Sequence, residues 1–101
     1  MKKNNILITS AGRRVSLVNS FKKELYYLDL SYKVYCTDFN PTLSSACQVA
    51  DGFFKIKRVT DKDYINELLA LCIKNNIGLV IPTIDTELEV LSKNKELFKK
   101  N

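Results

Sequence analysis

Two adjacent arginines follow a run of small residues near the start of the chain. The stretch "TSAGRR", residues 9–14, places Ser10 and Gly12 where backbone N–H groups can approach an anion at a helix N-terminus. Arg13 and Arg14 add fixed positive charge, which opposes the helix dipole in a first helical turn. A bound oxyanion, such as a phosphate or a carboxylate, removes that conflict. The alternative is that both arginine side chains reach past the helix to neighbouring carboxylates.

A second polar stretch, "TDFNP", spans residues 37–41 and follows an apolar run. Asp38 and Asn40 are candidates to bind polar groups of a ligand. Both residue types also form Asx turns, and Asn40-Pro41 is a common turn dipeptide. The sequence leaves both interpretations open.

A third polar stretch, "PTIDTE", spans residues 82–87 and follows a run of aliphatic residues. Asp85 and Glu87, with Thr83 beside them, are predicted to meet an amine or another polar group. Helix capping is the alternative, since Thr83 or Asp85 suits an N-cap and Thr86 suits the start of a capping box. Because capping accounts for each residue alone, the case for a site rests on the three stretches together.

These stretches do not form a dinucleotide-binding fingerprint. That motif needs three glycines in GxGxxG and an acid about twenty residues further on, which holds the ribose. Asp38 stands where the acid belongs, but Gly12 is the one glycine of the first stretch. An NAD-binding interpretation is therefore disfavoured.

The periodicity of apolar residues predicts which elements position the polar stretches. Strands are predicted over residues 6–9, 34–37, 51–56 and 77–82, and helices over residues 15–28, 42–49, 60–74 and 92–101. Thr60 with Asp63 resembles a capping box at the start of the third helix. The alternation predicts an α/β, three-layer Rossmann-like domain with a mostly parallel sheet of about four strands. In a parallel sheet the carboxyl ends lie at one edge, so the three polar stretches should meet there.

The length and composition fit one small domain. The 101 residues are 46% hydrophobic and 27% charged, and no apolar run approaches the roughly 18 residues of a membrane span. Cys36, Cys47 and Cys72 are odd in number and widely spaced, so we expect buried core residues instead of disulfides or a metal site. The start of the chain lacks the pattern of a signal peptide, which predicts a cytoplasmic protein.

The net charge of +5 is spread over separate segments. Basic residues occur at 2–3, 22–23, 55–58 and 93–100, without the interleaved aromatic residues that bind single-stranded nucleic acid. We therefore expect a solvated surface, with neither nucleic acid nor a membrane as partner. The element order ends without the further strand that such a sheet usually adds. Residues 1–101 are thus expected to be a single domain from the N-terminal part of a longer chain.

Three segments resemble the N-terminal, pre-ATP-grasp domain of ATP-grasp ligases: "ILITSAGRRVSLVNSFKKEL", "TDFNPTLSSACQVAD" and "LVIPTIDTEL". This domain type is biotin-carboxylase-like, and the similarity is to proteins like the carbamoyl-phosphate synthase large chain. The resemblance spans nearly the whole chain. Carried over residue by residue, the polar positions of the family fall on Ser10, Gly12, Arg13, Arg14, Asp38, Asn40, Pro41, Ala50, Asp51, Pro82, Thr83, Asp85 and Glu87.

The resemblance implies a domain that helps to bind the substrate of a carboxylate–amine or carboxylate–ammonia ligase. In this family MgATP transfers a phosphoryl group to a carboxylate, and an amine or ammonia then attacks the acyl phosphate. ATP and Mg²⁺ are held mainly by two later subdomains, so no catalytic or metal-ligating residue is expected in residues 1–101, and this domain alone should be inactive. The expected partners are a small-molecule substrate and an ATP-grasp core, in cis or in trans.

Two other functions fit the sequence. A free-standing module would bind a nucleotide or a small anion at the same edge without chemistry. A subunit that docks on a separate ATP-grasp chain would show an exposed apolar patch around the last helix. A homo-oligomer is compatible with each of these functions.

Overall fold

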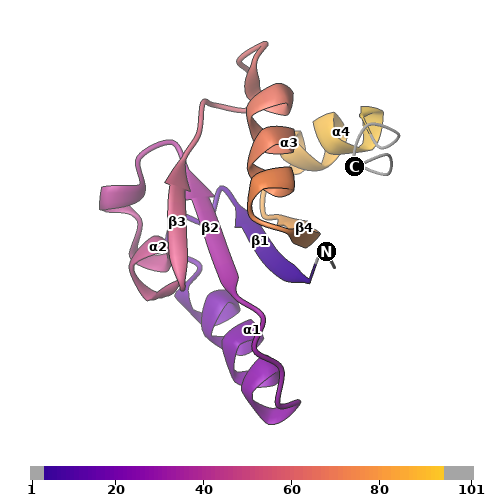
Figure 1. Cartoon of the computed structure of the whole chain (residues 1–101). Helices are drawn as coiled ribbons and strands as arrows, with labels where there is room; N and C mark the ends of the chain where they lie inside the picture. Colours follow the sequence, from indigo (N-terminus) through magenta and orange to yellow (C-terminus); the bar gives the residue numbers. More distant parts are fainter. Residues whose placement is uncertain (1–3, 95–101) are drawn as a thin grey trace.

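Four short apolar strands form one all-parallel sheet, with helices on both of its faces (Figure 1). The computed structural model describes residues 4–94. The elements in chain order are β1 (Asn5–Thr9), α1 (Val15–Tyr27), β2 (Val34–Asp38), a 3₁₀ helix (Pro41–Leu43), α2 (Ser45–Val49), β3 (Gly52–Lys55), α3 (Tyr64–Lys74), β4 (Ile77–Pro82) and α4 (Asp85–Lys93). The strand order is β3-β2-β1-β4. The predicted α/β, three-layer Rossmann-like fold is confirmed.

Each face of the sheet has its own apolar core. On one face, α1 and α2 cover a cluster made of Ile6, Ile8, Ala11, Val18, Val34, Cys36, Ala46 and Cys47. On the other face, α3 and α4 cover a cluster made of Leu7, Ile56, Tyr64, Leu68, Cys72 and Ile77. Alternate residues of β1 enter the two clusters because successive side chains of a strand point to opposite faces. All three cysteines are buried, as predicted.

α3 begins later than the sequence predicts. The capping box expected at Thr60 is not formed, and the first helical residue is Tyr64. Instead, the Asp61 side chain accepts a hydrogen bond from the N–H of Asp63 at 2.9 Å. The Asp61 carbonyl accepts another from the N–H of Tyr64 at 3.1 Å. Such Asx turns compete with helical hydrogen bonding, so this turn delays the helix.

The helix predicted over residues 42–49 is divided in two. A 3₁₀ helix covers Pro41–Leu43 and α2 covers Ser45–Val49, because the backbone of Ser44 is extended. Ser44 acts as the N-cap of α2, and its hydroxyl oxygen accepts a hydrogen bond from the N–H of Cys47 at 3.2 Å.

The last helix of the described chain, α4, covers Asp85–Lys93 and directly follows the third polar stretch. The helix predicted over residues 92–101 falls mostly on residues 95–101, which lie outside the described part. Across residues 4–94, each helix is too short or too polar to cross a membrane.

Replacing Leu68 by alanine should destabilise the fold, because this side chain is fully buried between α3 and the sheet. A Leu→Ala change in a core lowers the free energy of unfolding by about 2–5 kcal/mol. The matched control Leu43→Ala removes a side chain that is 80% exposed, and the change should stay below about 0.5 kcal/mol. Urea unfolding followed by circular dichroism measures both variants. Equal losses would show that Leu68 does not belong to the core.

Candidate functional site

Asp38 joins the first polar loop to the second. Its Oδ2 atom accepts a hydrogen bond from the N–H of Gly12 at 3.0 Å, and its Oδ1 atom accepts one from the N–H of Asn40 at 3.0 Å. The contact with Asn40 is the Asx turn that the sequence left open. The Asn40 side chain in turn accepts a hydrogen bond from the hydroxyl of Thr42 at 3.2 Å. Asp38 therefore acts as a link between two loops.

Thr83 joins the first polar loop to the third. Its hydroxyl oxygen lies 2.9 Å from the carbonyl oxygen of Thr9 and 2.7 Å from that of Ser10. The single hydroxyl proton is shared between these two acceptors. The loops after β1, β2 and β4 therefore meet at the carboxyl edge of the sheet, as predicted.

A buried carboxylate lies beneath this edge. Glu87 is 1% exposed, and its two oxygens accept four hydrogen bonds from other residues of the chain. Its Oε1 atom accepts from the hydroxyl of Thr9 at 2.9 Å and from the N–H of Thr83 at 3.4 Å. Its Oε2 atom accepts from the hydroxyls of Ser10 at 2.7 Å and Tyr64 at 2.6 Å. Because an unpaired buried charge is costly, these four donors fix α4 against β1, α3 and the β4 loop.

The sequence predicts a joint role for Asp85 and Glu87, but the structure places the two acids in different environments. Asp85 is exposed in the first turn of α4, whereas Glu87 is turned inward. The helix caps considered for this segment are absent. Ile84 occupies the N-cap position and no side chain caps the helix there, which excludes the N-cap at Thr83 or Asp85 and the capping box at Thr86. Glu87 instead reaches back to the third loop from the third position of the helix.

Ser10 and Gly12 both have left-handed backbones, with φ of 50° and 51°. This conformation is uncommon for serine, and the hydrogen bond from its hydroxyl to Glu87 holds it in place. A Cβ on Gly12 would meet no atom closer than 3.9 Å, so glycine is favoured here for its backbone angles and not for space. The Gly12 carbonyl oxygen accepts from the hydroxyl of Ser44 at 2.6 Å and from the N–H of Ala46 at 3.1 Å. The start of α2 thus supports the turn.

The first turn of α1 presents unneutralised positive charge. It has no acidic residue and no side-chain cap. The N–H groups of Ser16 and Leu17 have no acceptor among residues 4–94. Free N–H groups and the helix dipole together make such an end attractive to an anion.

Arg13 and Arg14 add to this charge and lie exposed. Among residues 4–94 the ion pairs involve Lys22, Lys57 and Lys93, and neither arginine takes part in one. The alternative that both arginines reach neighbouring carboxylates is therefore wrong for this part of the chain. Arg14 instead donates a hydrogen bond from Nη2 to the carbonyl oxygen of Thr83 at 3.2 Å, which orients the side chain without neutralising it.

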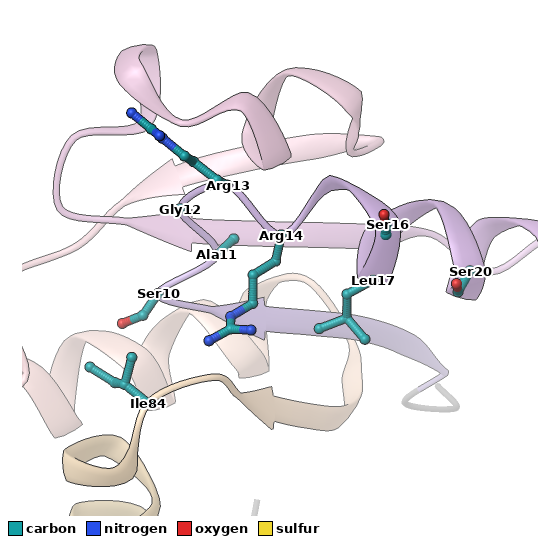
Figure 2. A pocket seen from close by; sticks show the side chains of 9 residues that line it. All are labelled: Ser10, Ala11, Gly12, Arg13, Arg14, Ser16, Leu17, Ser20 and Ile84. Carbon is teal, nitrogen blue, oxygen red and sulfur yellow. The ribbon is translucent and has the colours of Figure 1, made fainter.

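An open pocket of about 730 Å³ lies at this helix end. It is lined by Ser10, Ala11, Gly12, Arg13, Arg14, Ser16, Leu17, Ser20 and Ile84. Figure 2 shows that the Arg14 side chain points toward the loop that carries Ile84, whereas the Arg13 side chain points the opposite way. The structure therefore places the two arginines differently: Arg14 lies between the first and third loops, and Arg13 points away from the third loop.

Several residues of this site were missed from the sequence. Ser16 and Ser20 line the pocket, and their spacing of four residues on α1 was the available signal, because it places both on one face of a helix. Thr9 and Tyr64 hold Glu87, and only the folded arrangement brings them to it. Asp51, a polar position of the resemblance, lies away from this edge: its Oδ2 atom accepts from the N–H of the first residue of β2 at 2.8 Å.

A comparison with protein-family models matches residues 6–101 to the PylC-like, N-terminal domain, a pre-ATP-grasp-type domain of ATP-grasp ligases. The match includes all three polar loops and the pocket at the start of α1. No curated protein matches the chain.

Replacing Glu87 by glutamine should destabilise the fold while keeping the shape of the side chain. The substitution turns one carboxylate oxygen into an NH₂ group, so the two donors that it faces lose their acceptor. A buried donor without an acceptor lowers the free energy of unfolding by about 1–3 kcal/mol. The control Glu89→Gln alters an exposed acid of the same helix that pairs with Lys93, and should cost about 0.5 kcal/mol or less. Urea unfolding compares the two. A loss no larger in Glu87→Gln than in Glu89→Gln would contradict the role of the buried carboxylate.

The stability of the fold should fall at alkaline pH in a way that depends on Tyr64. Burial, followed by the hydrogen bond to Glu87, raises the pKa of Tyr64 well above its ordinary value of 10.0. The unfolded chain therefore releases this proton first, and unfolding becomes easier as the pH rises above about 10. We expect Tyr64→Phe, although less stable at neutral pH, to lose less unfolding free energy than the unmodified chain between about pH 8 and about pH 11.

The control for this pH dependence is Tyr26→Phe, because Tyr26 is 81% exposed. Its loss of unfolding free energy between the two pH values should match that of the unmodified chain. If Tyr64→Phe also matched the unmodified chain, Tyr64 would not be the group that titrates.

Proposed function

The chain belongs to the PylC-like, N-terminal domain family, and from that premise we propose that it is the substrate-side domain of an ATP-grasp ligase that joins a carboxylate to an amine or ammonia. The ligase would use ATP to convert the carboxylate into an acyl phosphate, which the nitrogen nucleophile then attacks. More specifically, we propose a reaction like that of the carbamoyl-phosphate synthase large chain. It is supported by the resemblance of the three polar stretches.

The observation that supports this proposal most directly is the pocket at the start of α1. Arg14, the free N–H groups of Ser16 and Leu17, and the positive end of the helix dipole all lie at this one pocket. Each of these groups favours a negative ligand, and a guanidinium can bind a carboxylate or phosphate through two hydrogen bonds. A carboxylate substrate and its acyl phosphate both meet this requirement.

The residues of the site divide into binding and supporting roles in this proposal. Arg14 holds the anionic group of the substrate, and Arg13 adds attraction at the rim. Exposed Asp85, at the start of α4, is the acid that remains available to an amine. Asp38 and Glu87 support the loops, since both oxygens of each carboxylate accept hydrogen bonds from the chain itself.

ATP and Mg²⁺ are expected to be held by an ATP-grasp core, in the same polypeptide or in a separate one. Glu87 does not fit direct coordination of Mg²⁺, because it is buried and each of its oxygens already accepts two hydrogen bonds. Phosphoryl transfer depends on positioning and on metal ions that neutralise the developing charge. The role of this domain is therefore to bind and orient the acid while the core supplies the phosphoryl group.

A free-standing anion-binding module is the second candidate. This candidate is favoured because residues 10–20 and Ile84 form the lining of the pocket without a second domain. Such a module would hold its anion without any ATP-grasp core. It would show the same affinity for that anion whether or not the core is present.

Replacing Arg14 by alanine in the polypeptide or complex that carries the ATP-grasp core should lower kcat/KM for the acid at least about tenfold, which corresponds to about 1.4 kcal/mol. The lost interaction is the charge-assisted contact between the guanidinium and the substrate anion. The matched control is Lys23→Ala, which removes the same charge from an exposed position of the same helix. Its kcat/KM should stay within about twofold of the unmodified enzyme.

Steady-state assays of ATP hydrolysis with varied acid concentration measure both variants. Equal effects of Arg14→Ala and Lys23→Ala would show that only the overall charge matters. No effect of Arg14→Ala would overturn the assigned role.

A further inference from the structure

Two of the three cysteines lie against each other beneath α2. Cys36 belongs to β2 and Cys47 to α2, and both are enclosed in the apolar cluster that α1 and α2 cover. The S–H group of Cys36 has two acceptors within reach, the carbonyl oxygen of Ala46 at 3.9 Å and the sulfur of Cys47. The third cysteine, Cys72, belongs to the cluster on the opposite face of the sheet. The fold therefore selects one pair of thiols out of the three.

The two thiols of this pair differ in reactivity. The hydrogen bond from Cys36, helped by one from Ser44, lowers the pKa of Cys47 below its ordinary value of 9.0, although burial acts in the other direction. The hydrogen bond to Cys47 and burial raise the pKa of Cys36. Because the thiolate is the nucleophilic form of cysteine, Cys47 is the sulfur that an oxidant meets first.

The part of the molecule that covers Cys47 is thin. α2 has five residues, and two of them, Ser45 and Gln48, are exposed. Leu43, just before this helix, is 80% exposed. Short elements with few buried contacts open locally at a lower cost than the whole fold. A small oxidant such as hydrogen peroxide therefore reaches Cys47 when α2 opens.

Both cysteines lie next to residues that hold the turn at Gly12. Asp38, two residues after Cys36, accepts a hydrogen bond from the N–H of Gly12 at 3.0 Å. Ala46, the residue before Cys47, donates its N–H to the carbonyl oxygen of Gly12 at 3.1 Å. Gly12 has a left-handed backbone and lines the pocket at the start of α1. A change in the distance between β2 and α2 is thus transmitted to the pocket.

We propose that peroxide oxidises Cys36 and Cys47 to a reversible disulfide, and that this bond displaces the turn at Gly12 and weakens anion binding in the pocket. The two sulfurs of a disulfide lie about 2.05 Å apart, much closer than two hydrogen-bonded thiols, so α2 moves toward β2. The carbonyl group of Gly12 follows α2, whereas its N–H stays with Asp38. The effect on the pocket rests on the proposed function, and formation of the disulfide does not.

Two steps form the bond. The Cys47 thiolate attacks one oxygen of hydrogen peroxide, the O–O bond breaks, and the hydroxide that leaves takes up a proton and becomes water. The sulfur of Cys36 then attacks the resulting sulfenic acid of Cys47, which forms the S–S bond and releases a second water with the Cys36 proton. Two thiols are oxidised and one peroxide is reduced to two waters. Two molecules of glutathione restore both thiols by exchange and are oxidised to glutathione disulfide.

Peptide mapping tests the bond. The folded chain is treated with hydrogen peroxide, unfolded, alkylated and digested without reductant, and the peptides are identified by mass spectrometry. We expect a linked pair of peptides that carry Cys36 and Cys47, an alkylated Cys72, and loss of the link when glutathione is added before unfolding. No link, a link to Cys72, a link between two chains, or a sulfinic acid at Cys47 without a link would overturn the proposal.

NMR spectra of the reduced and oxidised chain test the effect on the pocket. Oxidation should move the backbone N–H signals of Gly12 and Ala46. It should also raise the Kd for inorganic phosphate at least about fivefold, the lower end of the usual coupling between two sites. Cys47→Ala, which prevents the bond, should show neither change after peroxide treatment. Cys72→Ala should respond like the unmodified chain, and circular dichroism checks that both variants fold.

The two measurements separate this proposal from the proposed function. A disulfide that leaves the phosphate affinity unchanged would overturn the effect on the pocket. If the reduced chain did not bind phosphate, the proposed anion site would be overturned. The peptide map and the Gly12 signal would still decide whether the disulfide forms and displaces the turn.

Discussion

The carboxyl edge of this domain depends on one buried carboxylate. Glu87 is almost completely enclosed, and its two oxygens accept hydrogen bonds from three hydroxyl groups and one backbone N–H. A buried charge is tolerated only when such donors surround it, so the donors must come together when the chain folds. They come from β1, from the loop after it, from α3 and from the loop after β4. This single group therefore fixes the relative positions of elements that are far apart in the sequence.

The shape of the pocket follows from this arrangement. Ser10 is bound to the buried carboxylate and adopts a left-handed backbone, and Gly12 does the same while its N–H is held by Asp38. These two residues turn the chain sharply from the end of β1 into α1. As a result the first turn of α1, with its free N–H groups and Arg14, lines the pocket together with Ile84. Asp38 and Glu87 support the loops, whereas Arg13 and Arg14 are left exposed.

The sequence was sufficient for the fold and for the convergence of the loops, because both follow from local patterns. Apolar runs and helical periods gave the strands and helices, and parallel strands place their carboxyl ends at one edge. The sequence alone did not predict which acids support the loops and which stay exposed. Glu87 and Tyr64 are 23 positions apart, and no periodicity links them. The delayed start of α3 was missed because the turn at Asp61 competes with the capping signal at Thr60.

An NMR titration of the 101-residue chain with inorganic phosphate tests whether the start of α1 and Arg14 bind an oxyanion. We expect saturable shifts of the backbone N–H signals of Ser16 and Leu17, with much weaker shifts after Arg14→Ala. Shifts spread evenly over the lysine-bearing segments, or no saturable change at Ser16 and Leu17, would contradict it.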